Sequence, residues 1–554
     1  AYFNACTALV KLHKLEQALR YANKAHKLNP DYVEALYIRA LIFMHLGLEE
    51  QAKADAEQAV KLKPRHALAN NILGTINVEL KNFVQALVNY EIAIAEKDDI
   101  ECLLGKIAHL KMHLSDWRQH EEILNQLLAL IDQDKAVCQP FDLHSLVDAP
   151  EYHKRSAEIF YELSYRKNEE VVAPHHEPNQ RIHIAYFSSD IGSHPVGNLM
   201  AGVLEAHCKE NFEVSIFSLD NHSGSVRDRI FRASERFVNA EFLNEDEIVA
   251  LARSLRVDIA IDLNGYTGKN RTGIFQRRAA PIQINYIGYL GTMGSDCHDY
   301  IIGDQVMAPI EYEAHFTEKI IHLPCYQAND DKLEIPATTK SRADYDLPAD
   351  AFVFCSFNAN YKITPPIFAA WMQILHQVPG SVLWLHSKSE TAINNLRSAA
   401  ASLGISGDRL IFARTVPYLE HLARQRLADL FLDTTPYNAG ATASNALYCG
   451  LPLVTLLGKS FCSRYGGSLL TALDMPELIT HSIEEYVALC ITIASDRIHH
   501  AKLKEKLANN LKTQPLFDTR TFTRNLEMAF RTIHTRHQQG LPPTHIGLAE
   551  MLAS

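Results

Sequence analysis

The stretch Glu16-Gln17-Ala18 returns 34 residues later as Glu50-Gln51-Ala52, and once more in shortened form as Gln85-Ala86. Further residues keep the same step: Ala25, Ala59 and Ala93; Leu46 and Leu80; Pro30 and Pro64. Between these positions apolar residues recur every three or four, for instance over residues 35–46, which is the period of a helix with one buried face. The pattern predicts repeated helical hairpins over residues 1–98.

A spacing of 34 residues, with a small residue where two helices cross and a proline at the end of the unit, is the tetratricopeptide signature. A degraded fourth repeat is expected to run to about residue 133, because Trp117 stands 34 residues after Phe83. Stacked helical hairpins form an α-solenoid whose concave surface suits an extended polypeptide. The solenoid, assigned to residues 1–133, therefore predicts protein or peptide partners bound along the repeat surface.

Composition and charge narrow the class of protein. The 554 residues are too many for one core, and 47% hydrophobic with 21% charged residues is typical of an ordered chain of several domains. A formal net charge of −11 argues against a nucleic-acid or anionic-membrane partner, since those normally require a basic surface. We find no apolar run of about 18 residues that would predict a membrane span, and no signal peptide. Because the chain begins inside a repeat, we expect it to be a fragment of a longer protein.

The ten cysteines are scattered, and no two of them form a C-x-x-C pair. Zinc binding and redox chemistry are therefore not expected. We expect a reducing, cytoplasmic location. The sequence Asp132-Gln133-Asp134 has the spacing of a known metal-binding motif, but it stands at the end of a predicted helix ahead of the α/β region. We therefore expect neither a metal ion nor a cofactor.

From Arg181 onward the pattern changes to alternating strands and helices, after a linker at 134–180 with one or two helices. The strands expected first are 182–187, 212–218, 258–263, 282–287 and 300–303, with helices at 198–208 and 245–254. After Pro348 the alternation restarts, with strands at 352–357, 381–385, 409–412, 430–432 and 453–456. Such alternation indicates parallel sheets covered on both faces. We assign 181–345 to an N-terminal Rossmann-like domain and 346–554 to a C-terminal one that ends in a helix.

Two doubly wound domains in tandem bring the carboxyl ends of two parallel sheets to a cleft, which is a usual place for a nucleotide. One turn at such an edge is rich in small residues: a strand ends at Leu432, and an apolar helix begins at about Thr442. Small residues let backbone amides of a helix start approach an anion, which the helix dipole also favours. The turn predicts a diphosphate site; the alternative is a strand–turn–helix joint in which small residues serve packing alone.

Four polar side chains follow predicted strands and are candidate site residues. Lys362, after the strand at 352–357, can reach a phosphate and neutralise a departing diphosphate, although a lone lysine is more often a solvated surface group. His194, after the strand at 182–187, can act as a general base or hold a hydroxyl, unless it serves as a helix cap. His421 and Arg424, one helical turn apart, can contact a base or ribose, or simply belong to a charged surface helix.

Taken together, these segments resemble the O-GlcNAc transferase family, including its plant Spindly-type members, from about Arg181 to Thr535. The matching motifs of the first half are S-S-D-x-G-x-H-P at 188–195, L-N-G-Y-T at 263–267, A-P-I-Q at 280–283, G-Y-x-G-T-x-G at 288–294 and D-Y-I-I at 299–302. Those of the second half are F-N-x-x-Y-K-I at 357–363, S-V-L-W-L at 381–385, E-H-x-x-R at 420–424, L-A-D-x-x-L-D-T at 427–434 and S-R-x-x-x-S-L-L at 463–470.

The resemblance implies a GT-B fold, in which two Rossmann-like domains hold a nucleotide sugar between them. It implies transfer of a sugar from a nucleotide donor to Ser or Thr hydroxyls of proteins, with inversion and without a metal ion. By position, Lys362 would contact the diphosphate and assist the leaving group. Ala441 and Thr442 would give helix-start contacts to phosphate.

The remaining sites that the resemblance implies lie around the base and the sugar. His421, Arg424 and the backbone near Val416 would hold the uracil. Gly294 and its turn would lie near the sugar. His194 matches the histidine that is discussed in this family as a base or positioning group.

Several positions depart from the family pattern. Asn445 stands where an acidic residue usually grips the ribose, and Tyr418 replaces a lysine beside the base. Gly440 replaces a histidine near the sugar, Ala359 a glutamine near the pyrophosphate, and Asn198 a second histidine after His194. An amide bonds a hydroxyl less strongly than a carboxylate does. We still expect Asn445 and Tyr418 at the nucleotide and Gly440 at the sugar. The long insertion that the animal enzymes carry between the two domains is absent here.

Three functions follow for the whole chain. The first is a protein O-glycosyltransferase that uses UDP-GlcNAc. The second is the same chemistry with GDP-fucose or UDP-glucose, since Spindly-type relatives differ in donor. The third is a repeat scaffold whose transferase part no longer turns over, and the presence of Lys362, His194 and Thr442 argues against it.

Overall fold

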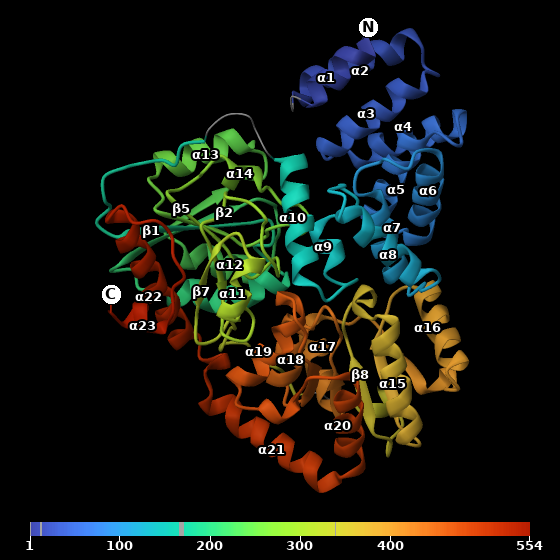
Figure 1. Ribbon diagram of the computed structural model, residues 1–554, viewed down its shortest axis with the longest axis vertical. Coiled ribbons are helices and arrows are strands. Elements are labelled where there is room, and N and C mark those ends of the chain that lie inside the picture. Colours follow the sequence, from blue (N-terminus) through green and yellow to red (C-terminus); the bar gives the residue numbers. More distant parts are fainter. Residues whose placement is uncertain (1, 12–13, 166–170, 338–339, 554) are drawn as a thin grey trace. The chain divides into compact units, whose positions relative to one another are not determined.

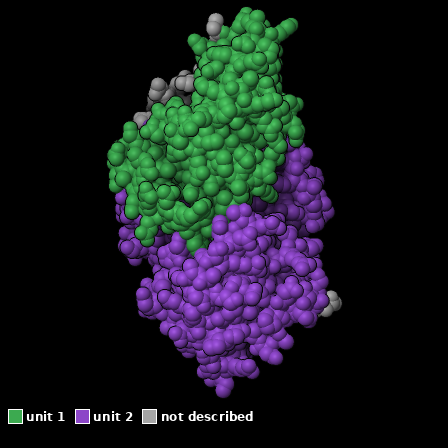
Figure 2. All heavy atoms as spheres, turned by 90° about the vertical axis from the view of Figure 1, so that its right-hand side faces the viewer, with its two compact units in different colours: residues 1–142 green, residues 143–554 purple. Residues whose placement is uncertain are grey.

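The computed structural model of the chain describes residues 2–11, 14–165, 171–337 and 340–553. The chain forms two compact units, residues 1–142 and 143–554, which Figure 2 shows in green and purple. The first unit is helical, and the second holds two parallel sheets with helices around them (Figure 1). The predicted fold class, a helical repeat array followed by two Rossmann-like domains, is confirmed.

Helical hairpins make up the first unit. Its helices are α1 (Tyr2–Lys11), α2 (Leu15–Leu28), α3 (Val33–His45), α4 (Glu49–Leu62), α5 (Ala67–Glu79), α6 (Phe83–Glu96), α7 (Leu103–His113) and α8 (His120–Ile131), and α9 (Pro140–Leu143) begins near its end. The alanines of the repeat pattern are buried inside the hairpins: Ala18 and Ala25, Ala52 and Ala59, Ala86 and Ala93. Gly74 acts in the same way, because a Cβ there would lie 2.5 Å from the Tyr90 ring.

The degraded fourth repeat is a helical pair, α7 with α8. Helix α8 begins at His120, later than the spacing from Phe83 to Trp117 predicts, because Gln119 takes a left-handed backbone conformation with φ of 61°. The compact unit also continues to residue 142, past the predicted end of the repeats at 133.

The second unit opens with α10 (Pro150–Ser164), a helix within the predicted linker at 134–180. The elements of the first sheet region are β1 (Ile182–Ser188), α11 (Pro195–Ala206), β2 (Phe212–Ser218), α12 (Ser225–Ala233), β3 (Arg236–Asn239), α13 (Glu245–Ser254), β4 (Ile259–Asp262), α14 (Gly273–Gln276), β5 (Ile282–Asn285), β6 (Tyr300–Gly303) and β7 (Lys319–His322). Their order is β3-β2-β1-β4-β5-β6-β7, and the paired strands are parallel. The sequence missed the short outer strands β3 and β7.

The second sheet repeats this plan. Its elements are β8 (Val353–Ser356), α15 (Pro365–Gln377), β9 (Val382–His386), α16 (Glu390–Ser402), β10 (Leu410–Ala413), α17 (Tyr418–Arg424), β11 (Leu430–Leu432), α18 (Ala441–Tyr448), β12 (Leu453–Leu456), α19 (Tyr465–Ala472), β13 (Ile479–Thr480), α20 (Ile483–Ser495) and α21 (Arg497–Thr513). The order is β10-β9-β8-β11-β12-β13, again parallel. The strands β8 and β9 pack buried aromatic side chains, among them Trp384.

The end of the chain returns to the first sheet, which corrects the assignment of all of 346–554 to the second domain. Helix α22 (Thr519–Gln538) packs on α11, where Glu527 Oε1 accepts hydrogen bonds from His207 Nδ1 at 3.0 Å and from the Cys208 amide at 2.7 Å. Ile546, just before α23 (Leu548–Ala553), forms a parallel bridge with Ile321 of β7. Figure 1 shows these helices in red beside the green first sheet.

Each sheet has one point where the strand order reverses, between β1 and β4 in the first and between β8 and β11 in the second. Ligands of open α/β sheets bind at the carboxyl ends of the strands at such points. Segments that follow these four strands hold His194, Asn264, Lys362 and Asp433. The topology therefore locates the candidate site before any side-chain contact is considered.

Candidate active site

Lys362 lies in a short turn directly after β8, and its ammonium contacts the turn that follows β11. Its Nζ donates a hydrogen bond to the backbone oxygen of Asn438 at 2.9 Å and lies 3.6 Å from the centroid of the Tyr437 ring. Burial lowers the pKa of Lys362 from 10.5 to about 8, against the attraction of the Asp433 carboxylate. The lysine is thus a cation at neutral pH whose charge is poorly hydrated, which favours an incoming anion.

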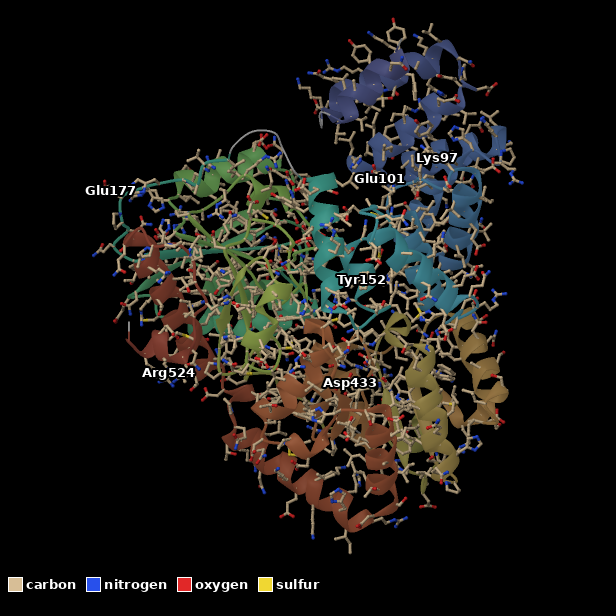
Figure 3. The ribbon with its side chains drawn as sticks, in the orientation of Figure 1. Lys97, Glu101, Tyr152, Glu177, Asp433 and Arg524 are labelled. Atoms are coloured by element: carbon tan, nitrogen blue, oxygen red, sulfur yellow. The ribbon has the colours of Figure 1, made fainter. Side chains whose placement is uncertain are left out.

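Asp433 holds the β11 turn in shape. Its Oδ1 accepts hydrogen bonds from the amides of Thr434 and Ala439, at 2.8 and 2.7 Å, and its Oδ2 accepts one from Thr455 Oγ1 at 2.7 Å. Burial raises the pKa of Asp433 to about 6, although these hydrogen bonds oppose the rise. Figure 3 labels this residue in the second sheet region. Because the turn is tied at both ends, the Asn438 oxygen that receives Lys362 is fixed in place.

The helix start predicted at about Thr442 is α18, which begins at Ala441. Its first hydrogen bond runs from the Ser444 amide to the Gly440 oxygen at 3.0 Å, so the amides of Ala441 and Thr442 lie ahead of the helical ladder, as in the first turn of any helix. Both residues are partly exposed. Gly440 is required for packing, because a Cβ there would lie 2.3 Å from the Tyr465 ring. The turn that leads into this helix start also contains Asn438, whose oxygen accepts the Lys362 ammonium.

His421 and Arg424 lie together, and aromatic rings enclose Arg424. Its side chain is buried, with 1% of the residue exposed, among the rings of Tyr345, Phe357 and Trp384 at 5.5–5.9 Å. Its Nη2 donates to His421 Nδ1 at 2.8 Å. The Arg424 side chain therefore orients His421, and its direct contact with a base stays a prediction.

The state of His421 follows from this contact. Burial, with the Arg424 charge nearby, lowers the pKa of His421 to about 3. The imidazole is therefore neutral at pH 7, and because Nδ1 accepts a hydrogen bond from Arg424, the proton stands on Nε2. His421 thus offers an N–H donor to whatever lies beyond Nε2.

Tyr418 and Asn445, the two replaced residues near the expected nucleotide, form a pair. The Tyr418 hydroxyl donates to Asn445 Oδ1 at 3.3 Å, which joins the first residue of α17 to α18. The pair is uncharged, and the Asn445 side-chain NH₂ group remains as a donor. Val416 lies in the turn between β10 and α17 and is partly buried.

His194 lies at the switch point of the first sheet, where it is both a helix cap and a candidate base. Its Nδ1 accepts the Val196 amide of α11 at 3.4 Å and lies 3.6 Å from Asp190 Oδ1, and 43% of its side chain is exposed. Asp190 Oδ2 accepts a hydrogen bond from Asn264 Nδ2 at 2.8 Å. Burial lowers the pKa of His194. While Nδ1 accepts the Val196 amide, the proton of the neutral ring stands on Nε2. The Asp190 carboxylate favours the other tautomer, in which Nδ1 donates and Nε2 can accept a proton.

Gly294 does not lie open toward a sugar. It has a positive φ of 60° and packs under α10, where a Cβ would lie 2.4 Å from the Glu158 amide. The residue is buried. The turn and the approach of α10 therefore explain why residue 294 is a glycine, and its contact with a sugar stays a prediction.

Sequence reasoning missed Asp190, Asp433 and Asn438 as parts of the site. Each of the two acids stands at the carboxyl end of a buried strand, and that signal was available in the sequence. Asn438 carried no such signal, because only the folded turn brings its oxygen to Lys362.

Two Rossmann-like domains with polar side chains gathered at both strand-order switch points define the GT-B class of fold. Residues 157–332 and 325–526 match the family model described as Glycosyl transferase family 41, and residues 4–52 match a tetratricopeptide repeat model. The chain belongs to glycosyl transferase family 41. The resemblance identified from the motifs is thereby confirmed.

Two relatives of this chain are named as UDP-N-acetylglucosamine–peptide N-acetylglucosaminyltransferases. A protein of Arabidopsis thaliana named probable UDP-N-acetylglucosamine–peptide N-acetylglucosaminyltransferase SEC is 36% identical over 380 residues, which is 67% of this chain and 39% of that protein. The UDP-N-acetylglucosamine–peptide N-acetylglucosaminyltransferase of Caenorhabditis elegans is 28% identical over 482 residues, covering 66% of this chain and 42% of that protein. The matches therefore span about two fifths of the length of these relatives.

A solved structure resembles almost the whole chain. It is that of a mutant of the Thermobaculum terrenum O-GlcNAc transferase, with a TM-score of 0.72 and 26% sequence identity, and the match covers 96% of each chain. The similarity therefore extends over the repeat array and both sheets.

The described residues, 2–11, 14–165, 171–337 and 340–553, hold neither a metal-binding cluster nor a helix that could span a membrane. In those ranges no group of three or more His, Cys, Asp and Glu side chains is arranged to hold a metal ion. Asp132 and Asp134 lie at the end of α8, within the repeat unit. Nor does any helix in the described part of the chain have the length and apolar character to cross a membrane.

Proposed function

We propose that this chain transfers N-acetylglucosamine from UDP-GlcNAc to Ser or Thr hydroxyls of proteins, with inversion at the sugar and without a metal ion. The observation that carries the proposal is the position of Lys362: a partly buried cation beside the start of α18, at the strand ends where a parallel sheet binds nucleotides. The names of the relatives agree with this donor.

In this proposal Lys362 and the α18 start act on the leaving group. The diphosphate gains negative charge as the bond to the sugar breaks, and a pre-positioned ammonium stabilises that charge more than it stabilises the intact donor. Amides of Ala441 and Thr442 add the helix-start contact, and the Thr442 hydroxyl adds a donor. No metal is needed for this neutralisation.

On the first sheet, His194 serves as the proton acceptor for the incoming hydroxyl. In this role the ring gives up the Val196 contact and takes the tautomer in which Nδ1 donates to Asp190, itself held by Asn264, so that Nε2 can accept the proton. On the nucleotide side, the Nε2–H of His421 and the Asn445 amide provide donors to the base and ribose. Protein acceptors bind along the repeat surface, which is the usual role of such an array. A cytoplasmic location agrees with ten cysteines that are all free thiols.

A ligand panel measured by thermal shift tests the donor. A ligand that binds only the native state raises the melting temperature by mass action. We expect a rise with UDP and UDP-GlcNAc and none with GDP, GDP-fucose or UDP-glucose beyond what UDP itself gives. A rise with GDP compounds alone would move the assignment to fucose transfer. No rise with any of the five would favour the scaffold without turnover.

A transfer assay then tests the reaction. The chain is incubated with UDP-GlcNAc carrying a labelled sugar and with an array of Ser- and Thr-containing peptides, and label on peptide is counted with and without a chelator. We expect transfer that the chelator leaves unchanged. Loss of transfer with the chelator would refute the metal-free part of the proposal.

Arg424 should affect nucleotide binding only through His421. We expect Arg424→Met, which keeps the aliphatic length but removes the donors, to weaken UDP binding by about tenfold, because one well-placed hydrogen bond of His421 is lost. Turnover at saturating donor should stay within about twofold. The matched control is Arg409→Met, whose guanidinium also bonds two backbone oxygens at 2.8 Å each, those of Ser381 just before β9 and of Leu375 on α15. Calorimetry of UDP binding decides: equal affinity in both variants would contradict the role.

A further inference from the structure

The segment that joins the repeat array to the first sheet, residues 143–153, contacts the second sheet region through Asp148. This carboxylate accepts hydrogen bonds from four donors of the loop that follows β12. Lys459 N bonds Oδ2 at 2.8 Å, while Ser460 N, Ser460 Oγ and Ser463 Oγ bond Oδ1 at 2.8, 2.6 and 2.7 Å. Burial of Asp148 opposes its charge, but the hydrogen bonds from Ser460 and Ser463 prevail and lower its pKa. Asp148 is therefore a charged cap on this loop.

The backbone of the same loop approaches the carboxylate closely at Gly458. A Cβ at Gly458 would lie 2.4 Å from Asp148 Oδ2 and 2.3 Å from Ser463 Oγ, so the backbone has to approach without a side chain. The loop and Asp148 are thus fitted to each other at close range.

From this loop, two hydrogen bonds lead to the lysine. The Asn438 amide donates to the backbone oxygen of Cys462 at 3.1 Å, and the Asn438 oxygen accepts the Lys362 ammonium at 2.9 Å. Asp148 fixes the loop, the loop fixes Asn438, and Asn438 fixes Lys362.

The connecting segment has a second contact with this turn, through His144. Its buried ring stacks on Tyr289 of the first sheet region, with centroids 4.8 Å apart and planes at 24°, and meets Tyr437 edge-on at 5.9 Å. Tyr437 is the ring beneath the Lys362 ammonium. Burial lowers the pKa of His144 well below its ordinary value, so the ring is neutral. Because it is neutral, the His144 ring can pack against Tyr437 without repelling the Lys362 ammonium.

We infer that Asp148 and His144 are positioning residues for Lys362, so that the segment leading out of the repeat array is a working part of the active site. The inference rests on the proposed function, in which Lys362 neutralises the leaving diphosphate. Residues 143–153 follow the repeat array directly in sequence. The array that is proposed to bind the acceptor is therefore continuous with the segment that positions Lys362.

The test is Asp148→Asn, which puts an NH₂ group where one carboxylate oxygen accepted a hydrogen bond. We expect turnover to fall by about tenfold while the KM for UDP-GlcNAc changes by less than about twofold, since a displaced lysine loses mainly transition-state charge stabilisation. A loosened turn also admits water to the ammonium. The high-pH limb of the rate profile, set by Lys362 near pH 8, should therefore move upward, toward the ordinary lysine value of 10.5.

The matched control is Asp496→Asn, which removes an aspartate cap from α21, where Asp496 accepts the amides of Ile498 and His499 at 2.9 and 3.0 Å. A general loss of stability would appear in both variants, whereas the shift of the pH limb belongs to Asp148 alone. If Asp148→Asn does not fold, Ser463→Ala removes a single donor and should show the same shift at smaller size. A rate profile and turnover equal to wild type in both variants would overturn the inference.

Failure of the proposed function is separable from failure of this inference. The pKa of Lys362 is measured without any substrate, by following the pH dependence of its chemical labelling in wild type and in Asp148→Asn. If wild type transfers no sugar but the labelling pKa still rises in the variant, the positioning role holds and the proposed reaction fails. If wild type transfers sugar and the labelling pKa is unchanged, the positioning role is wrong.

Discussion

Replacing Lys362 with methionine is expected to lower the turnover of sugar transfer by about 100-fold while UDP affinity falls by less than about tenfold. The unequal losses follow because the ammonium stabilises charge that develops as the diphosphate departs, which binding of the intact donor does not require in full. Turnover is measured with labelled donor at saturation, and affinity by calorimetry. Lys512→Met, at an exposed position near the end of α21, is the control and should match wild type in both. Full activity of Lys362→Met would remove the lysine from the mechanism.

The wild-type rate should fall as pH rises through about 8, because only the protonated lysine can serve and burial has lowered its pKa to that value. The effect on stability has the opposite sign. Between pH 8 and 10.5 the unfolded chain still holds the proton that the native lysine has lost, so stability rises with pH across this window. Below pH 8 the native state carries the cost of a buried ammonium. Lys362→Met should therefore melt at a higher temperature than wild type at pH 7, so that the catalytic group is also a destabilising one.

Much of this site was predictable from the sequence because parallel sheets place strand ends together. Lys362 and the helix start near Thr442 come within a few residues of predicted strands, and the reversal of strand order brings both to one edge. His194 was predicted at the corresponding edge of the first sheet for the same reason. These predictions needed the alternation of strands and helices, and no knowledge of any particular side-chain contact.

The sequence is least informative where a residue's surroundings depend on partners distant in sequence. Gly294 is buried by α10, a helix outside both sheets, which no local pattern reveals. Arg424 has the spacing of a ligand contact, but three rings from three separate segments enclose it. Asp148 reaches a loop more than three hundred residues away in sequence and looked like part of a linker. The short outer strands β3 and β7 were not predicted, and none of the four residues of β3 is buried as a core strand would be.

Asp433→Ala is expected to destabilise the protein by about 3 kcal/mol, because it leaves the amides of Thr434 and Ala439 and the Thr455 hydroxyl without their acceptor in a buried turn. Transfer should fall with it, since the Asn438 oxygen that fixes Lys362 lies in the same turn. Chemical denaturation measures the loss. A change within about 0.5 kcal/mol would mean that the turn keeps its shape without the carboxylate.

Asp433→Asn separates charge from shape in this turn. An amide oxygen can still accept the Thr434 and Ala439 amides, and the Thr455 hydroxyl can turn to accept from the new NH₂ group, so stability at pH 7 should stay close to wild type. The carboxylate charge, however, is what raises the Lys362 pKa against burial. Without that charge the pKa should fall, and the high-pH limb of the rate should move below 8. Asp148→Asn is expected to move the same limb upward. Opposite shifts from two Asp→Asn changes would distinguish loss of an attracting charge from loss of burial, and a shift in the same direction for both would contradict this account of how the lysine is tuned.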